Sequence, residues 1–267
     1  IIKRGQWRGL RFSGLVTIGN SADITPTELL EYYFADPQTK AIGLYLEDVK
    51  DGKVFANTLR SDVTGKPVVL LLGGRSTQGR LAAASHTGAL ASDYLAWQSL
   101  EKQANCIIVA TLNCFIDVLL ALQSYDLRPE KPTKNVTLFG NGGGSSVVGA
   151  DIFANQGLDV LPFKEETQKK LEMLNLPPGT SIVNPVDTPV KTLQEKDGWV
   201  AGEILDIIYD TAQPDAIAMH LNLASFVGRG DVDPVDNLLT VVEQIQAARP
   251  GMAHFGLALR TDGSPEL

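Results

Sequence analysis

The sequence predicts an α/β protein with two doubly wound domains, in which helices cover both faces of a parallel sheet. Short apolar runs rich in Val, Ile and Leu alternate with helical patterns, as expected for strands that are buried on both faces. The alternation stops once, at the polar segment 126–135 (DLRPEKPTKN), and then begins again. We therefore expect a first domain over residues 1–128 and a second over residues 134–267.

The first domain opens with residues that resemble the tail of a helix, so we expect its N-terminal strand to be missing. The following helix has a clear start, because Thr25, Pro26 and Glu28 suit the N-cap, the first and the third helical positions of a capping box. The predicted strands of this domain are 14–19, 41–47, 66–74 and 106–110. Its predicted helices are 25–36, 53–63, 89–104 and 114–125.

The second domain begins with a predicted strand at 135–140, a glycine-rich turn and a helix at 145–157. Its other predicted strands are 158–163, 180–185, 216–223 and 253–260. Its other predicted helices are 165–175, about 199–212 and about 234–248. Because no helical pattern follows the last strand, we expect the chain to be a piece of a longer polypeptide.

The composition argues against several classes of function. The formal net charge of −8 does not suit a general nucleic-acid or anionic-membrane surface. No apolar run approaches the roughly 20 residues that cross a bilayer. Two cysteines, Cys106 and Cys114, provide neither a disulfide framework nor a metal site. We expect a cytoplasmic protein without a metal centre.

The segment 73–92 (GGRSTQGRLAAASHTGALAS) follows a predicted strand and carries His86 among small residues. In open α/β sheets, functional loops lie beyond the carboxyl ends of the strands. This segment is longer than the roughly two to six residues usual for such a connection. Taken alone, His86 is compatible with a residue that caps the next helix. A long, glycine-containing segment also suits a nucleophile that must visit more than one place.

A glycine-rich turn directly follows strand 135–140 and opens a helix. Free backbone N–H groups and the helix dipole favour an anion at such a turn. The candidate phosphate ligands are Asn141, Gly142, Gly143, Gly144, Ser145 and Ser146. Taken alone, the motif is also compatible with an ordinary turn, and it half-matches a dinucleotide-binding fingerprint. Against the fingerprint, Phe163 and Lys164 stand where an acidic residue is expected.

Two polar residues, Asn184 and Asp187, lie at the carboxyl end of the predicted strand 180–185. They could bind the phosphate or a substrate, and the Asn-Pro-Val-Asp sequence is equally good turn chemistry. His220 and His254 lie within apolar strands, and we interpret both as structural.

Several segments together resemble one family. The segment 73–92 is similar to the phosphohistidine segment of the nucleoside-diphosphate-forming acyl-CoA synthetases, the superfamily of succinyl-CoA synthetase. In that pattern, a Gly-Arg pair and a run of small residues precede Ser-His-Thr-Gly-Ala, and His86 falls on the histidine that carries the phosphoryl group. Other segments that resemble the family, in order, are 16–24, 41–55, 138–160 and 181–189.

The resemblance implies two flavodoxin-like domains and an acid–thiol ligase that converts acid, CoA and NTP to acyl-CoA, NDP and phosphate through an acyl phosphate. His86 and Glu47 would be the catalytic pair. A neutral imidazole is abundant near its reference pKa of about 6.5, and Glu47 would accept a hydrogen bond from the second ring nitrogen. The turn Asn141–Ser146 would receive the phosphoryl group, with Asn184 and Asp187 beside it.

The resemblance also implies partners. CoA, and ATP or ADP with Mg, would be bound mainly by domains outside this chain, a CoA-binding domain and an ATP-grasp domain or subunit. We expect a small carboxylic acid as substrate and an oligomeric assembly. Two alternatives stay open: the acyl-CoA-sensing region of a protein acetyltransferase, and a dinucleotide-binding oxidoreductase. The presence of both His86 and Glu47 favours catalysis over sensing.

Overall fold

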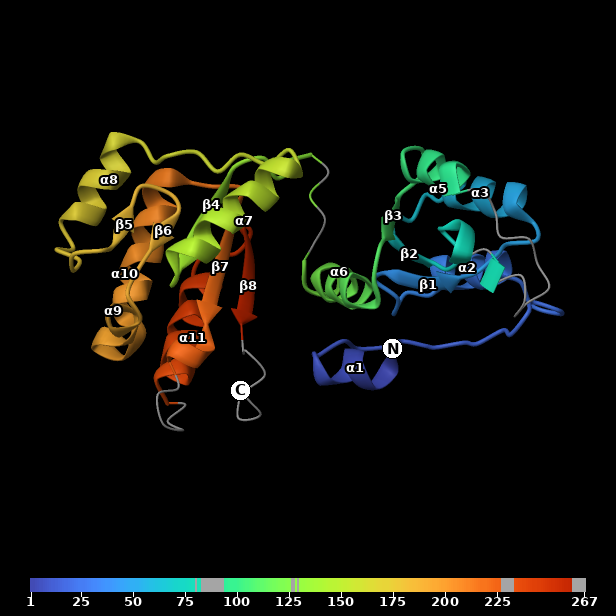
Figure 1. The fold of residues 1–267 in the computed structure, drawn as a ribbon, viewed down its shortest axis with the longest axis horizontal. Coiled ribbons are helices and arrows are strands. Elements are labelled where there is room, and N and C mark those ends of the chain that lie inside the picture. The colour runs from blue at the N-terminus through green and yellow to red at the C-terminus, as the bar shows by residue number, and fades with distance from the viewer. Residues whose placement is uncertain (80, 83–93, 126–127, 129, 227–232, 261–267) are drawn as a thin grey trace. The chain divides into compact units, whose positions relative to one another are not determined.

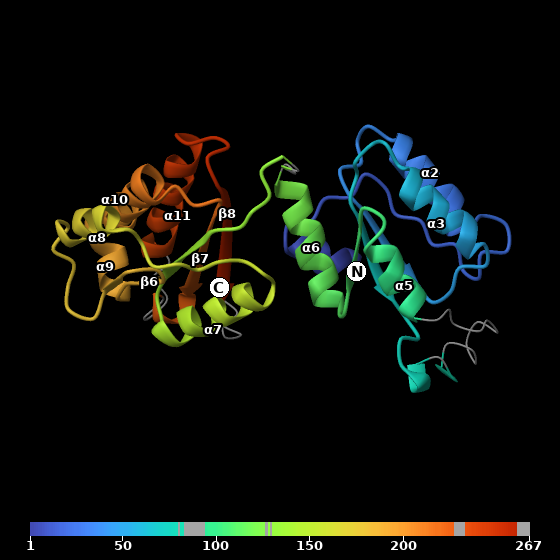
Figure 2. The ribbon, with the colours of Figure 1, turned by 90° about the horizontal axis from the view of Figure 1, so that it is seen from above.

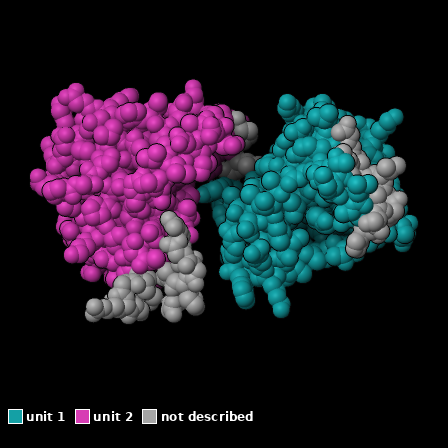
Figure 3. Space-filling view, viewed as in Figure 1, with its two compact units in different colours: residues 1–127 teal, residues 128–267 magenta. Residues whose placement is uncertain are grey.

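The computed structural model describes residues 1–79, 81–82, 94–125, 128, 130–226 and 233–260. The chain divides into two units, Ile1–Leu127 and Arg128–Leu267, which Figure 3 shows in different colours. Each unit is an α/β fold built on a sheet with parallel strands, as the alternating pattern predicts. No helix in the described ranges is long and apolar enough to cross a membrane.

Unit 1 has a parallel sheet with the strand order β1 (Ile42–Leu46), β2 (Val68–Leu72) and β3 (Cys106–Val109). Helices lie on both of its faces (Figures 1 and 2). One face packs against α2 (Pro26–Ala35), α3 (Gly52–Ser61) and α5 (Tyr94–Glu101), with Leu70 at the centre of that core. The other face packs against α6 (Leu112–Ser124) through the neighbouring Val69. Alternate residues of one strand therefore serve two cores.

The sequence predicts the start of the helix at 25–36 correctly, but it does not predict the segment just before that helix correctly. Thr25 Oγ1 accepts from Glu28 N at 3.3 Å, and Glu28 Oε2 accepts from Thr25 N at 2.8 Å, so the capping box is confirmed. The tail-like N-terminal segment forms α1 (Ile2–Trp7). The strand predicted at 14–19 is wrong. This segment has no ladder partner among the residues that the structure describes, and Leu15 and Val16 remain about half exposed at 48% and 49%.

Unit 2 has five strands within its described part: β5 (Ser181–Ile182), β6 (Val186–Asp187), β4 (Val136–Gly140), β7 (Ala216–Asn222) and β8 (His254–Arg260), in that spatial order. The pairs β6–β4, β4–β7 and β7–β8 are parallel, whereas β5 and β6 form an antiparallel pair. Helix α7 (Gly143–Asn155) covers one face, as Figure 2 shows.

The opposite face of this sheet carries the main core of unit 2. It packs against a group of helices: α8 (Glu165–Glu172), α9 (Val190–Gln194), α10 (Trp199–Ile207) and α11 (Asp233–Ala247). Helix α10 continues into a π-helical turn, η2 (Ile208–Ala212), which accounts for the long helix predicted at 199–212. Helix α7 is different, because Ser146 is its one buried residue.

In unit 2 the strand prediction 158–163 is wrong, and the prediction 180–185 holds only for Ser181–Ile182. A single side chain explains the first difference. Residues 158–163 run beside β4 but make one isolated bridge, between Asn135 and Asp159. The Asn184 amide takes the place of further pairing, because it bonds to the backbone of β4 and to Leu161 O. In the predicted strand 180–185, two residues pair, and they pair with β6. The strand beside β4 is therefore Val186–Asp187, directly after the predicted one.

Candidate functional site

The carboxyl end of the unit 1 sheet brings Glu47 next to the end of β2. The strands β1 and β2 are in register, Leu46 opposite Leu72, and Gly73 N donates to Leu46 O at 2.8 Å. A Cβ on Gly73 would lie 3.1 Å from Glu47 Cγ and 3.3 Å from the Tyr45 hydroxyl. Glycine at this position therefore leaves room for both side chains above the sheet edge.

Tyr45 lies on the same side of β1 as Glu47 and orients it. Its hydroxyl donates to Glu47 Oε1 at 3.0 Å. Burial raises the pKa of the Tyr45 hydroxyl from 10.0, and the hydrogen bond to Glu47 and the negative charge of Glu47 raise it further. The phenol therefore keeps its proton at neutral pH. One carboxylate oxygen of Glu47 is held by Tyr45, a residue for which the sequence predicts no role.

Arg75 closes the same end of the sheet from the side of β3. Its Nη2 donates to Ala110 O at 2.7 Å, and its guanidinium carbon lies 5.9 Å from the centre of the Tyr94 ring. Glu47 and Arg75 line a recess of about 10 Å³, room for about one water molecule. His86, the predicted phosphohistidine, lies outside the described residues, so its pairing with Glu47 stays a prediction.

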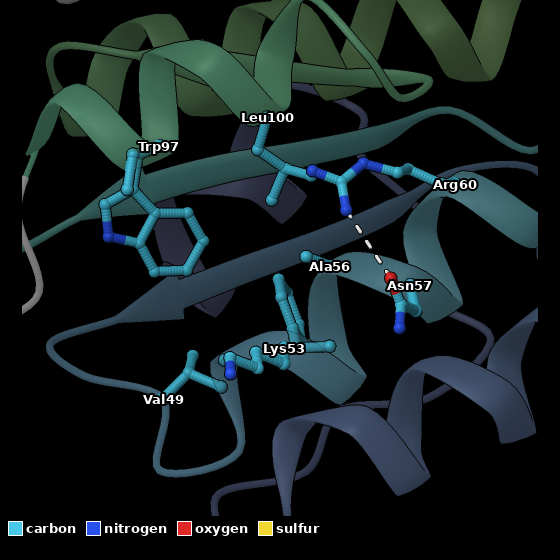
Figure 4. A pocket seen from close by; sticks show the side chains of 10 residues that line it. Val49, Lys53, Ala56, Asn57, Arg60, Trp97 and Leu100 are labelled. Carbon is cyan, nitrogen blue, oxygen red and sulfur yellow. Dashed lines mark hydrogen bonds between the residues drawn. The ribbon is translucent and has the colours of Figure 1, made fainter.

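A larger cavity of about 400 Å³ lies between α3 and α5 (Figure 4). Its wall is apolar, with Phe55 and Trp97 edge-to-face at 5.8 Å between ring centres. Arg60 lies at its rim, where it donates to Asn57 at 3.5 Å and to Gln103 at 2.8 Å. Trp97 also borders the Glu47 recess. The sequence does not single out this cavity, because its lining residues follow ordinary helix spacing.

In unit 2 the glycine-rich turn lies at the carboxyl end of β4 and opens α7. Gly142 has φ +113°, a conformation that favours glycine, and its N–H donates to Asp187 Oδ1 at 2.7 Å. No described residue accepts a hydrogen bond from the N–H of Gly143 or Gly144. Both N–H groups belong to the first turn of the helix, where backbone donors lack intrahelical partners and the dipole is positive. This part of the turn can bind an anion.

The side chains of the two asparagines predicted here, Asn141 and Asn184, make hydrogen bonds to backbone groups. The buried Asn141 amide joins the ends of β4 and β7, because Oδ1 accepts from Asn222 N at 2.9 Å and Nδ2 donates to Asn222 O at 3.5 Å. The Asn184 amide is 8% exposed and makes three bonds, to Leu138 N, Val136 O and Leu161 O. Asp187 reaches the turn, whereas the Asn184 side chain points into the sheet.

His220 belongs to this site as well. Its Nε2 lies 3.0 Å from Ser146 Oγ, in the first turn of α7. The ring is half-buried, and Ser146 is buried. Burial lowers the pKa of His220 from 6.5, and the negative charge of Asp187 opposes that shift. From the sequence we interpret His220 as structural, because it lies in an apolar strand. No sequence signal connects it with the turn.

The structure also bears on the dinucleotide-binding alternative and on the potential for metal binding. A dinucleotide-binding fingerprint needs a strand after its helix, and residues 158–163, which follow α7, do not form one. Across the described residues, no group of three or more His, Cys, Asp and Glu side chains is placed to hold a metal ion. His254 packs elsewhere in unit 2, where its Nε2 accepts from Arg128 Nε at 2.9 Å.

Comparison with known proteins identifies the relatives of this chain. Residues 1–122 match the family described as the succinyl-CoA ligase like flavodoxin domain. The alpha subunit of ADP-forming acetate–CoA ligase II of Pyrococcus furiosus is 29% identical over 96% of this chain and 54% of its own length. The alpha subunit of ADP-forming acetate–CoA ligase I of the same organism is 37% identical over 66% of this chain and 37% of its own length.

A solved structure agrees with these relatives. Acetyl-coenzyme A synthetase 1 of Ca. Korarchaeum cryptofilum, in complex with phosphate and ADP, has a TM-score of 0.73 and 25% identity, covering 94% of this chain and 51% of that protein. The chain thus spans about half the length of the relatives that match almost all of it. By these matches the chain belongs to the succinyl-CoA synthetase superfamily of nucleoside-diphosphate-forming acyl-CoA synthetases.

Proposed function

We propose that this chain is the phosphohistidine core of an NDP-forming acyl-CoA synthetase, a ligase that interconverts acid, CoA and NTP with acyl-CoA, NDP and phosphate. The observation that carries the proposal is the position of Glu47. It stands at the carboxyl end of β1 beside the end of β2, and the segment that contains His86 follows β2. Relatives that match 96% and 66% of the chain are named ADP-forming acetate–CoA ligases.

In the proposed transfer, the unprotonated ring nitrogen of His86 attacks the phosphorus of an acyl phosphate. The bond between phosphorus and the acyl oxygen breaks, and the carboxylate leaves with its electron pair. The ring becomes positive while its second nitrogen keeps a hydrogen, which it donates to Glu47. Because Tyr45 holds one oxygen of Glu47, the carboxylate has a fixed orientation and its second oxygen is left for the ring. Fixing a partner before the reaction lowers the cost of positioning it.

The turn Asn141–Ser146 is proposed to bind the transferred phosphoryl group. The N–H groups of Gly143 and Gly144 are its donors, with Ser145 exposed beside them. Asn141 and Asp187 set the shape of the turn through their bonds to Asn222 and Gly142. We propose no phosphate contact for Asn184, because its amide already bonds three backbone groups.

The remaining components of the reaction are proposed on other parts of the protein. A CoA-binding domain and an ATP-grasp domain or subunit would bind CoA and ATP or ADP with Mg. The full assembly would be an oligomer in the cytoplasm that acts on a small carboxylic acid. The solved relative that contains phosphate and ADP supports a nucleotide-using reaction.

Phosphorylation of the purified full-length protein tests the proposal. With acyl phosphate or radiolabelled ATP, the protein should acquire a label that is lost in acid and stable in alkali, as expected for a phosphorylated nitrogen. His86→Asn should abolish the label. His254→Gln is the matched control, because that histidine lies in unit 2 against Arg128, and it should label normally. Persistent label in His86→Asn, or an acid-stable label, would refute the assignment.

A further inference from the structure

Three residues of unit 2 lie at one level of the sheet. Gly140 is opposite Asp187 on β6 and opposite His220 on β7. A Cβ on Gly140 would lie 1.9 Å from His220 O and 2.8 Å from His220 Nδ1, so the backbone and the imidazole of His220 together occupy the place where a side chain would stand. From there the ring reaches Ser146 at 3.0 Å. The absence of a side chain at Gly140 lets the imidazole lie directly under the start of α7.

The pair of His220 and Ser146 has two hydrogen-bond arrangements. If the ring is neutral with its hydrogen on Nδ1, Nε2 accepts, and the Ser146 hydroxyl must direct its hydrogen at the ring. If a proton from solvent adds to Nε2, the ring donates to Ser146 Oγ, and the hydroxyl hydrogen is released to point elsewhere. The serine is buried, so its hydroxyl has few other partners to choose from. A neutral ring with its hydrogen on Nε2 would also donate to Ser146, but only the protonated ring both donates there and carries a positive charge. Protonation of His220 therefore fixes the ring as the donor and leaves the Ser146 hydroxyl free to donate to an anion at the turn.

The charges around the turn favour the second arrangement when an anion is bound. Asp187 places a carboxylate against Gly142, with Oδ2 3.0 Å from where a Cβ of Gly143 would lie. A bound dianion therefore has a like charge close by, which raises its energy. In the described part of unit 2, Asp187 is the charged group that acts on the His220 ring, and its negative charge raises the pKa of that ring. A positive ring would offset both negative charges.

We propose that His220 is a positioning residue of the phosphate-binding turn, which takes up one proton from solvent when a tetrahedral dianion binds and so converts Ser146 into a donor toward that anion. This inference rests on the proposed function, in which the turn Asn141–Ser146 receives the phosphoryl group. In the free protein, burial lowers the pKa of His220 from 6.5, so the ring is neutral near pH 7.

Proton linkage gives the proposal a measurable consequence. Binding that favours the charged ring must raise the pKa of His220, and by reciprocity protonation must strengthen binding. Affinity for a dianion is then constant below the pKa of the free protein. It falls by up to about tenfold per pH unit between the free and bound pKa values, and it levels off above them.

Sulfate is the probe that isolates this effect, because it stays a dianion between about pH 5 and 8, where histidine titrates. Titrations of the purified full-length protein should show affinity for sulfate that falls as pH rises. The NMR signal of His220, identified by its loss in His220→Gln, should shift to a higher pKa when sulfate is added. Glutamine keeps a donor near the position of Nε2 but cannot titrate, so this variant should bind sulfate with no pH slope. His254→Gln is the control and should keep the slope.

The outcomes separate this inference from the proposed function. If sulfate perturbs the amides of Gly143 and Gly144 while the pKa of His220 and the pH slope do not change, the role of His220 is refuted and the turn remains a binding site. If sulfate leaves those amides unperturbed, the turn is not an anion site and both ideas fall. Ser146→Ala supplies a second check. It should weaken sulfate binding at low pH and have little effect at high pH, and equal weakening at both would refute the hydroxyl mechanism.

Discussion

The carboxyl ends of the parallel strands carry a candidate site in both units, and the two sites have opposite chemistry. In unit 1, side chains define the site, with the Glu47 carboxylate held by the Tyr45 phenol and Arg75 bonded across to Ala110. In unit 2, backbone defines it, with the N–H groups of Gly143 and Gly144 at the start of α7. The first site offers a negative charge, and the second offers hydrogen-bond donors.

This difference matches the two requirements of the proposed transfer. A histidine that becomes positive needs a carboxylate beside it, and a phosphoryl group that carries negative charge needs donors. A carboxylate with one oxygen left open, as in Glu47, would repel the phosphoryl group if it stood at the turn. Asp187 is held at the turn by Gly142 N at 2.7 Å, and its charge lies near His220. One fold thus supports either half of the chemistry, depending on which side chains the strand ends carry.

The largest expected effect tests whether the unit 2 site depends on backbone packing. In Gly140→Ala, the new Cβ would lie 1.9 Å from His220 O, a backbone atom that cannot move without moving β7. We expect a loss of more than about 3 kcal/mol of folding free energy, at the upper end for overpacked cores. Hydrogen exchange resolved by segment should show this loss in unit 2 strands.

The matched variant is Gly43→Ala on β1 of unit 1. Its Cβ would meet Phe115 Cζ at 2.7 Å and Leu119 Cδ1 at 2.9 Å, which are the ends of side chains and can shift. We expect a cost of about 1–2 kcal/mol, confined to unit 1. If the two substitutions lowered the free energy of unfolding equally, the contrast between a unit 2 site built on backbone and a unit 1 site built on side chains would be contradicted.

The second prediction concerns the charge that distinguishes unit 1. Glu47→Gln keeps size and shape but removes the charge that stabilises a positive His86 ring. We expect phosphorylation in a single turnover to slow by about 10–100-fold, by analogy with the partners of metal-bound histidines. Glu31→Gln, an exposed carboxylate on α2, is the control and should phosphorylate at the normal rate. An unchanged rate in Glu47→Gln would reduce Glu47 to an ordinary strand-end carboxylate.

Local signals in the sequence predict much of this fold. The capping box of Thr25 and Glu28 is contained within four residues, and it is present as predicted. The strand β2 is a continuous apolar run, and every residue of β4 is buried, because helices cover both faces of their sheets. Glu47 and Gly142 are found at strand ends for the same reason, since the end of an apolar run is visible in the sequence.

The missed features depend on contacts between distant residues. Residues 158–163 contain the apolar pattern of a strand. The Asn184 amide, more than twenty residues away, makes the hydrogen bond to Leu161 O that a neighbouring strand would otherwise make. His220 looks like a core histidine, because its link to Ser146 joins residues 74 apart. In the sequence, Tyr45 is simply a residue type that favours strands. Its hydrogen bond to Glu47 depends on the space that Gly73 leaves. Such pairings follow from how helices and strands are placed, and local pattern does not encode that placement.

The smallest expected effect tests whether orientation, as well as charge, matters at Glu47. Tyr45→Phe removes the donor 3.0 Å from Glu47 Oε1 and keeps the ring. Tyr45 is 53% exposed, so water can replace part of the bond. We expect a loss of about 0.5–1 kcal/mol, which is about two- to fivefold in the rate of His86 phosphorylation.

A double-mutant cycle separates positioning from a general structural role. If Tyr45 acts through Glu47, adding Tyr45→Phe to Glu47→Gln should slow the reaction no further, because the charge that the phenol orients is already absent. Thermal unfolding of Tyr45→Phe should resemble that of the unaltered protein, since an exposed hydroxyl contributes little to the core. Additive losses in rate would mean that Tyr45 contributes to the site independently of Glu47. The unit 1 site would then consist of two separate groups, where the structure indicates one oriented carboxylate.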